Sequence, residues 1–154
     1  MPTFFLDSSA IAKRYVTEAG SAWIIALTEA TSRNVCWLTA VTRVEVAAGL
    51  YRRHRMGHLT AIDTQRAVAA FLHEYAVAFR VLAVDSVILD SAVKLVGAHP
   101  IRAYDALQLG GAIRLRAEYE RAGLLPPVFV SSDQALNRAA LAEGMVIEDP
   151  TAHP

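Results

Sequence analysis

The sequence predicts an α/β protein: a single domain over residues 1–154, with a central parallel sheet of four to five strands flanked by helices (α/β/α). Short apolar runs of strand length alternate with longer segments of helical periodicity, as in parallel sheets that are covered on both faces. The 154 residues suit one domain, and 54% of them are hydrophobic while 19% are charged, which indicates a folded core. No linker or internal repeat divides the chain.

The predicted elements follow one another in a regular order. The apolar runs have the composition of buried strands, and the segments between them repeat apolar residues at helical spacing. Strands are expected at Thr3–Leu6, Val35–Leu38, Arg80–Val84, Val128–Val130 and Met145–Ile147. Helices are expected at Ser8–Val16, Ala22–Thr28, Val41–Arg53, Ala61–Tyr75, Val87–Val96, Ala103–Tyr119 and Ala135–Ala142.

Two of these helices carry further expectations. In the helix at Val41–Arg53, Val44 and Tyr51 fall on one apolar stripe, which predicts the buried face of that helix. In the helix at Ala103–Tyr119, the small residues Gly110 and Gly111 predict the close approach of another backbone, at some loss of helix propensity.

Composition excludes several classes of function. The formal net charge is zero, so bulk charge does not predict nucleic-acid binding. Cys36 is the only cysteine, which rules out an intrachain disulfide. No charged leader precedes a long apolar stretch, and no apolar stretch has the length of a membrane span. We therefore expect a soluble, cytoplasmic protein with no membrane partner.

Four acidic residues stand where a carboxylate is conspicuous. Asp7 and Asp133 follow predicted strands, and Glu45 and Asp105 lie within apolar helical stretches. Ligand sites of parallel sheets lie beyond the carboxyl ends of the strands. If folding gathers these carboxylates, their mutual repulsion requires a bound hard cation.

Each acidic residue also has a purely structural interpretation. Asp7 and Asp133 suit helix N-caps, and so does Asp85, which shows that an aspartate after a strand is not by itself a catalytic signature. Asp105 suits the first turn of a helix, where the helix dipole favours a negative charge. Glu45 either pairs with a nearby arginine, such as Arg43 or Arg52, or belongs to a site.

Four motifs together resemble a known family. They are Leu6-Asp7-Ser8-Ser9-Ala10, Val44-Glu45-Val46, Tyr104-Asp105-Ala106-Leu107-Gln108-Leu109 and Ser131-Ser132-Asp133. In this order and spacing, over almost the whole chain, they resemble the PIN-domain family, and in particular the VapC-type toxin ribonucleases of toxin–antitoxin pairs. The third motif is the most specific of the four.

The resemblance implies a metal-dependent ribonuclease. By it, Asp7, Glu45, Asp105 and Asp133 match the family's metal-binding and catalytic positions, Ser9 and Ser131 match supporting hydroxyls, and Asp85 falls outside the set. Gln108 stands where many members carry histidine. The implied cofactor is Mg²⁺ or Mn²⁺, and the implied reaction is hydrolysis of RNA by metal-activated water. The implied partners are RNA, a cognate antitoxin protein and a second copy of the chain.

The arginines are the candidates for contacts with RNA phosphates. Arg14, Arg43 and Arg102 are the first candidates. The cluster Arg52-Arg53-Arg55 is the second choice, because solvated helix faces or salt bridges explain it slightly better.

Two other functions compete with this interpretation. A HAD-like phosphatase also begins with an aspartate after a strand, but its second acidic position is occupied here by Ser9, and no phosphate-binding glycine loop is present. A catalytically weak RNA- or partner-binding module on the same fold is the stronger alternative. Metal titration discriminates, because such a module has no need to bind Mn²⁺ at the four acidic residues.

Overall fold

The structure, a computed structural model, describes residues 1–153 of the chain. Its centre is a five-stranded sheet in the order β3-β2-β1-β4-β5, and all neighbouring strands run parallel. The strands are β1 (Thr3–Leu6), β2 (Val35–Thr39), β3 (Arg80–Leu82), β4 (Val128–Val130) and β5 (Ile147–Glu148). The predicted fold class, an α/β protein with a parallel central sheet, is confirmed.

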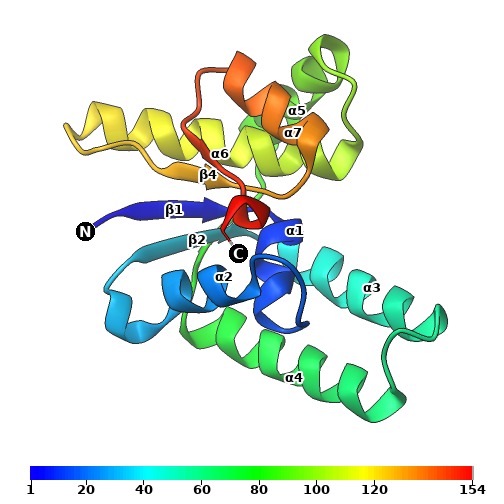
Figure 1. Cartoon of the computed structure of the whole chain (residues 1–154). Helices are drawn as coiled ribbons and strands as arrows, with labels where there is room; N and C mark the ends of the chain where they lie inside the picture. The colour runs from blue at the N-terminus through cyan, green and yellow to red at the C-terminus, as the bar shows by residue number, and fades with distance from the viewer. Residues whose placement is uncertain (154) are drawn as a thin grey trace.

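Helices cover both faces of this sheet. Figure 1 shows α5, α6 and α7 above it and α1 to α4 below it. The helices are α1 (Ser8–Ile11), α2 (Ser21–Thr28), α3 (Thr42–Arg55), α4 (Ala61–Val77), α5 (Ser86–Ala98), α6 (Ala103–Arg121) and α7 (Gln134–Ala142). Short 3₁₀ turns lie at η1 (Ala12–Arg14), η2 (Ala30–Ser32) and η3 (Pro150–Ala152).

The alternation of side chains along the strands divides the core in two. Phe5 of β1 and Phe129 of β4 stack at 5.9 Å between ring centroids, within the cluster under α5, α6 and α7. The adjacent Leu6 and Val130 point to the opposite face and join the cluster formed with α1 to α4. Because successive residues of a strand face opposite sides, each strand contributes to both cores.

The small residues of α6 allow the close packing that the sequence predicts. A Cβ atom on Gly111 would lie 2.9 Å from Cγ2 of Thr39, and one on Gly110 would lie 3.4 Å from the carbonyl oxygen of Ile88 in α5. α6 therefore sits directly against β2 on one side and α5 on the other.

The predicted buried face of α3 is wrong. Val44 and Tyr51 are exposed, and the buried side chains are instead Thr42, Val46 and Leu50. These three also repeat at helical spacing, so periodicity alone allowed either face. Val44 instead lines the cleft described below, where its exposure leaves it beside the acidic residues.

The segment predicted as one helix at Ser8–Val16 is divided. α1 ends at Ile11, and a 3₁₀ turn follows because the backbone N–H of Tyr15 bonds to the carbonyl of Ala12, three residues earlier. Within residues 1–153, no helix has both the length and the apolar composition to cross a bilayer.

The strand order changes direction at the centre of the sheet. From β1 the chain first builds outwards through β2 and β3, and it later returns to the other side of β1 with β4 and β5. In parallel α/β sheets such a switch point opens a crevice beyond the carboxyl ends of the two central strands. Asp7 follows β1, and Ser131 follows β4, so the fold places both at this crevice.

Candidate active site

A cleft of about 770 Å³ lies at this switch point. All four predicted acidic residues, Asp7, Glu45, Asp105 and Asp133, line it, and Asp85 does not. Asp85 is an exposed N-cap of α5 that accepts from the backbone of Ile88 and pairs with Arg114. Folding therefore brings the four predicted carboxylates to one cleft and leaves Asp85 outside it.

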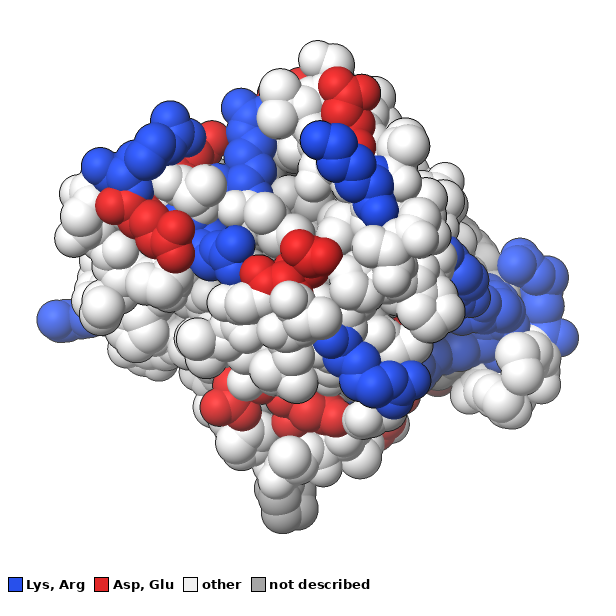
Figure 2. Space-filling model, turned by 90° about the horizontal axis from the view of Figure 1, so that it is seen from above, with Lys and Arg blue, Asp and Glu red and all other residues white. Residues whose placement is uncertain are grey.

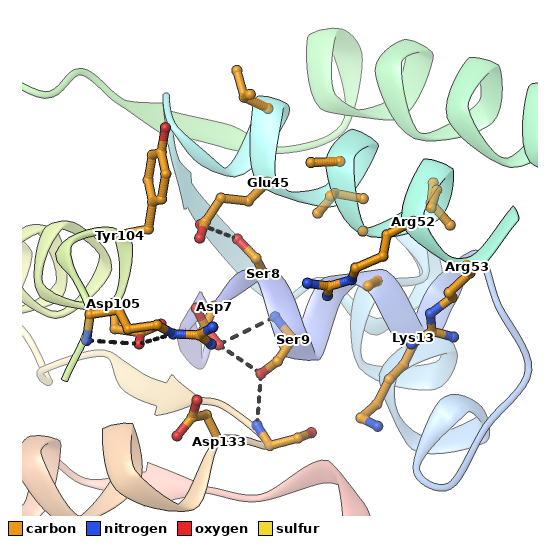
Figure 3. Close-up of a pocket in the computed structure, with 18 of the residues that line it drawn as sticks. Asp7, Ser8, Ser9, Lys13, Glu45, Arg52, Arg53, Tyr104, Asp105 and Asp133 are labelled. Carbon is orange, nitrogen blue, oxygen red and sulfur yellow. Dashed lines mark hydrogen bonds and ion pairs between the residues drawn. The ribbon is translucent and has the colours of Figure 1, made fainter. Parts of the chain in front are cut away.

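Each carboxylate enters the cleft from the start of a helix. Asp7 is the N-cap of α1, Asp133 is the N-cap of α7, and Glu45 and Asp105 lie in the first turns of α3 and α6. Figure 3 shows the four side chains directed into one space from these separate elements. Helix N-termini favour negative charge, so the local structure tolerates the cluster even though the carboxylates repel one another.

Asp7 is held at the bottom of the cleft by the two predicted serines. Its Oδ2 atom accepts from Oγ of Ser9 at 2.6 Å and from Oγ of Ser131 at 3.0 Å. The carboxylate is 4% exposed. Within the described chain, its other oxygen, Oδ1, accepts no hydrogen bond.

Glu45 is held by Ser8 and Gln108, a pairing that the sequence does not predict. Its Oε2 atom accepts from Oγ of Ser8 and from Nε2 of Gln108, each at 2.6 Å. No arginine of residues 1–153 pairs with it, which decides against the predicted alternative of Arg43 or Arg52. Ser8 belongs to the Asp7 motif, but nothing in the sequence links it or Gln108 to Glu45.

Asp105 and Asp133 also use one oxygen each for local structure. Oδ2 of Asp105 accepts from the backbone N–H of Arg102 at 3.2 Å and lies 3.5 Å from Nε of the same residue. Oδ1 of Asp133 accepts from the backbone N–H of Leu136 at 3.0 Å, which caps α7.

The four carboxylates therefore share one arrangement. In each, a single oxygen is anchored by hydrogen bonds, and within residues 1–153 the other accepts none. The capping roles and a role as ligands are thus compatible, because different oxygens of the same carboxylate serve them.

The pKa of Asp7 lies well above its ordinary value. Burial, and secondarily the charge of Glu45, raise its pKa from the ordinary 3.8 to about 6, although the hydrogen bonds from Ser9 and Ser131 oppose the change. Among residues 1–153, no basic side chain forms an ion pair with Asp7, Glu45 or Asp133. Asp7 is thus a buried carboxylate with a carboxylate neighbour and no paired cation. A divalent ion bound there would supply the positive charge that offsets both.

The donor set fits a hard cation that keeps much of its water. All four side chains offer oxygen, the ligand atom that Mg²⁺ and Mn²⁺ prefer. Within residues 1–153, however, no three His, Cys, Asp or Glu side chains stand close enough together to form a metal cage. The open arrangement suits Mg²⁺, which is commonly bound through one or two carboxylates with waters completing its shell.

Basic residues line one side of the same cleft. Lys13 and Arg53 both pair with Glu18, at 3.2 and 2.9 Å, and Arg52 and Arg55 lie on the last turns of α3. Figure 2 shows basic side chains gathered at its right edge, the side on which Figure 1 places the end of α3, whereas charges of both signs are interspersed elsewhere on this face. The sequence analysis did not anticipate Lys13 at the cleft.

The candidate phosphate contacts divide accordingly. Arg102 lines the cleft, as do the second-choice arginines of α3, but Arg14 and Arg43 do not. Arg14 instead donates to Glu74 at 2.7 Å and pairs with Glu29, an engagement that holds α4 against η1. Arg14 and Arg43 therefore lie outside the lining of this cleft, and their contact with RNA stays a prediction.

Comparison with solved structures identifies the fold. A chain of VapBC2 from Rickettsia felis, solved bound to a DNA fragment from their promoter, aligns over 96% of this chain and 98% of its own, with a TM-score of 0.62 and 12% identity. FitAcB from Neisseria gonorrhoeae aligns over 98% and 99%, with a TM-score of 0.62 and 15% identity. A toxin–antitoxin complex from Klebsiella pneumoniae aligns over 96% and 97%, with a TM-score of 0.57 and 14% identity.

The chain shares the fold of the aligned chain in each of these structures. The architecture expected from the PIN-domain resemblance is thereby confirmed over nearly the full length of the chain. No protein-family profile and no curated protein sequence matches the chain. At these identities the likeness concerns the fold, and the activity is argued from the site.

Proposed function

We propose that this protein is a metal-dependent endoribonuclease, the toxin of a type II, VapBC-like toxin–antitoxin pair. The observation that carries the proposal is the convergence of Asp7, Glu45, Asp105 and Asp133 on one cleft, each with an oxygen that no described residue bonds. The fold shared with toxin–antitoxin complexes supports it.

Asp7 and Asp105 would be the central ligands of Mg²⁺ or Mn²⁺, with Glu45 and Asp133 beside them. When bound, such an ion lowers the pKa of a coordinated water and neutralises charge on a phosphodiester. Ser9 and Ser131 keep Asp7 in place by bonding its other oxygen.

The basic rim would hold the RNA backbone. Arg52 and Arg55 form no ion pair within residues 1–153, so their guanidinium groups are available for phosphates. Arg102 also lines the cleft, beside Asp105. A local basic rim reconciles RNA binding with zero net charge, because phosphate contacts depend on where the charges lie.

Two protein partners belong to the same proposal. A cognate antitoxin is suggested by the complexes that share the fold. A homodimer would cover apolar side chains that α5 leaves exposed, such as Val87 and Val93. Both partners are proposed for this chain and are separate from the chemistry of the cleft.

Substitution of single carboxylates tests the activity. Asp7→Asn and Asp105→Asn should each reduce RNA cleavage in Mg²⁺ by about 100-fold or more, because several kcal/mol of transition-state stabilisation depend on the ion. Cleavage of labelled RNA by the purified chain is the measurement. Asp85→Asn is the matched control, since that aspartate also caps a helix but lies outside the cleft.

Full cleavage by both cleft variants would overturn the proposed site. A wild-type chain that binds RNA but neither cleaves it nor binds Mn²⁺ would support the alternative, a binding module on the same fold.

A further inference from the structure

Gln108 is a completely buried polar residue of α6, one turn after Asp105. Its neighbours along the helix, among them Leu109 and Ala112, belong to the apolar core. A buried amide must satisfy two N–H donors and a carbonyl acceptor, and leaving them unpaired is unfavourable. The partners here come from β2, α3 and α1.

The amide has one orientation that its surroundings permit. Oε1 accepts from Oγ1 of Thr39 at 3.1 Å and of Thr42 at 3.3 Å, whereas Nε2 lies 2.6 Å from Oε2 of Glu45. The reversed amide would set its oxygen against the carboxylate oxygen, and both are acceptors. The Glu45 carboxylate, which only accepts, therefore fixes the end of the amide that donates to it, and the hydroxyl of Thr42, 2.9 Å from Nε2, is compatible with either end.

Two donors converge on the same oxygen of Glu45. Nε2 of Gln108 and Oγ of Ser8 both lie 2.6 Å from Oε2, and they lie 2.9 Å from each other. Such short contacts are typical of hydrogen bonds to a charged group. Within residues 1–153 the remaining oxygen, Oε1, accepts no hydrogen bond, so it is the oxygen free to take a ligand in the cleft.

We propose that Gln108 is a positioning residue that fixes the Glu45 carboxylate with Oε1 available to the cleft. The inference rests on the proposed nuclease function and deepens it. Gln108 is not among the residues that line the cleft, so it acts through Glu45. Holding a glutamate in advance removes the loss of side-chain freedom that would otherwise accompany the reaction. Substitution of groups that orient ligands in this way commonly lowers metal affinity or activity about 10–100-fold.

The variant Gln108→Met tests this role, because methionine has a similar length and no hydrogen-bonding amide. Its kcat for RNA cleavage in Mg²⁺ should fall about 10–100-fold while KM changes by less than about threefold, since the lost interaction acts on the reacting geometry and not on RNA affinity. Thr64→Val is the control, because Thr64 is also buried but bonds only its own helix, at the carbonyl of Thr60.

A second measurement uses the wild-type chain and does not depend on activity. The sequence has only three glutamines, and Gln65 is exposed, so the side-chain amide of Gln108 can be assigned by nuclear magnetic resonance. One of its protons should be shifted downfield and exchange slowly with water. The shift should disappear in Glu45→Ala.

The outcomes separate this inference from the proposed function. An unchanged kcat in Gln108→Met, or an amide signal that Glu45→Ala does not alter, overturns the positioning role while a cleaving wild type keeps the nuclease proposal. A wild type that neither cleaves RNA nor binds Mn²⁺ overturns the proposed function and the positioning role with it. The kcat loss together with the lost amide shift supports the inference.

Discussion

At the scale of single residues, the cleft depends on carboxylates whose two oxygens have different surroundings. Asp7 gives one oxygen to Ser9 and Ser131, and Glu45 gives one to Ser8 and Gln108. The anchoring bonds limit rotation of each carboxylate, so the free oxygens are held in the cleft without a ligand. Burial, and secondarily the charge of Glu45, raise the pKa of Asp7.

The raised pKa of Asp7 makes the stability of the metal-free chain depend on pH. The pKa of Asp7 in the folded protein, about 6, lies above its ordinary value of 3.8, so the folded state binds more protons between these values. The free energy of unfolding should therefore fall as pH rises through this window, and the penalty should persist above it.

The variant Asp7→Asn should remove the penalty. In chelator at about pH 7.5 it should be more stable than the wild type by about 1–3 kcal/mol, and at about pH 4 the difference should shrink markedly. Urea unfolding at the two pH values measures this. Asp85→Asn should act with the opposite sign at the higher pH, because its partners Arg114 and Ile88 lower the pKa of Asp85. A less stable Asp7→Asn at the higher pH would contradict the account.

At the scale of elements, the site is made by packing that brings four helix N-termini together. α6 is central to this, because it carries Asp105 into the cleft and Gln108 behind it, and because Gly111 lets it lie against Thr39 of β2. Thr39 also bonds the amide of Gln108. The spacing between α6 and β2 therefore controls a contact that supports Glu45.

The variant Gly111→Ala should disturb that spacing. The added Cβ would lie 2.9 Å from Cγ2 of the fully buried Thr39, so we expect a loss of about 1–2 kcal/mol, in which overpacking outweighs the better helix propensity of alanine. Urea unfolding is the measurement. Gly97→Ala in α5 is the matched control and should gain about 0.5–1 kcal/mol, because nothing lies within 4 Å of its Cβ position. Equal effects at both glycines would refute the packing argument.

At the scale of the whole molecule, the reversal of strand order places the cleft. β1 and β4 are neighbours in the sheet although they are far apart in the sequence, and the residues that follow them meet at Asp7 and Ser131. A ligand bound there contacts segments from most of the chain, so binding should stabilise the fold as a unit.

Binding of Mn²⁺ should therefore raise the melting temperature. At a free concentration about 100 times the dissociation constant, the expected rise is about 5–10 °C for a domain of this size. A thermal melt with and without Mn²⁺ measures it. Asp7→Asn should show a much smaller rise, and an equal rise in that variant would place the ion elsewhere.

The sequence by itself determined the α/β class and the positions of Asp7 and Asp133 after strands, and the resemblance of its motifs to the PIN-domain family selected the set of four carboxylates. The class and these two positions follow from alternation, helical periodicity and capping, which act over a few neighbouring residues. The tertiary structure alone decided that Gln108 meets Glu45, that Arg14 is bound to Glu74, and that Val44 faces the cleft. The physical reason is distance along the chain: these contacts join residues from different helices and strands, and their pairing depends on how the helices pack on the sheet.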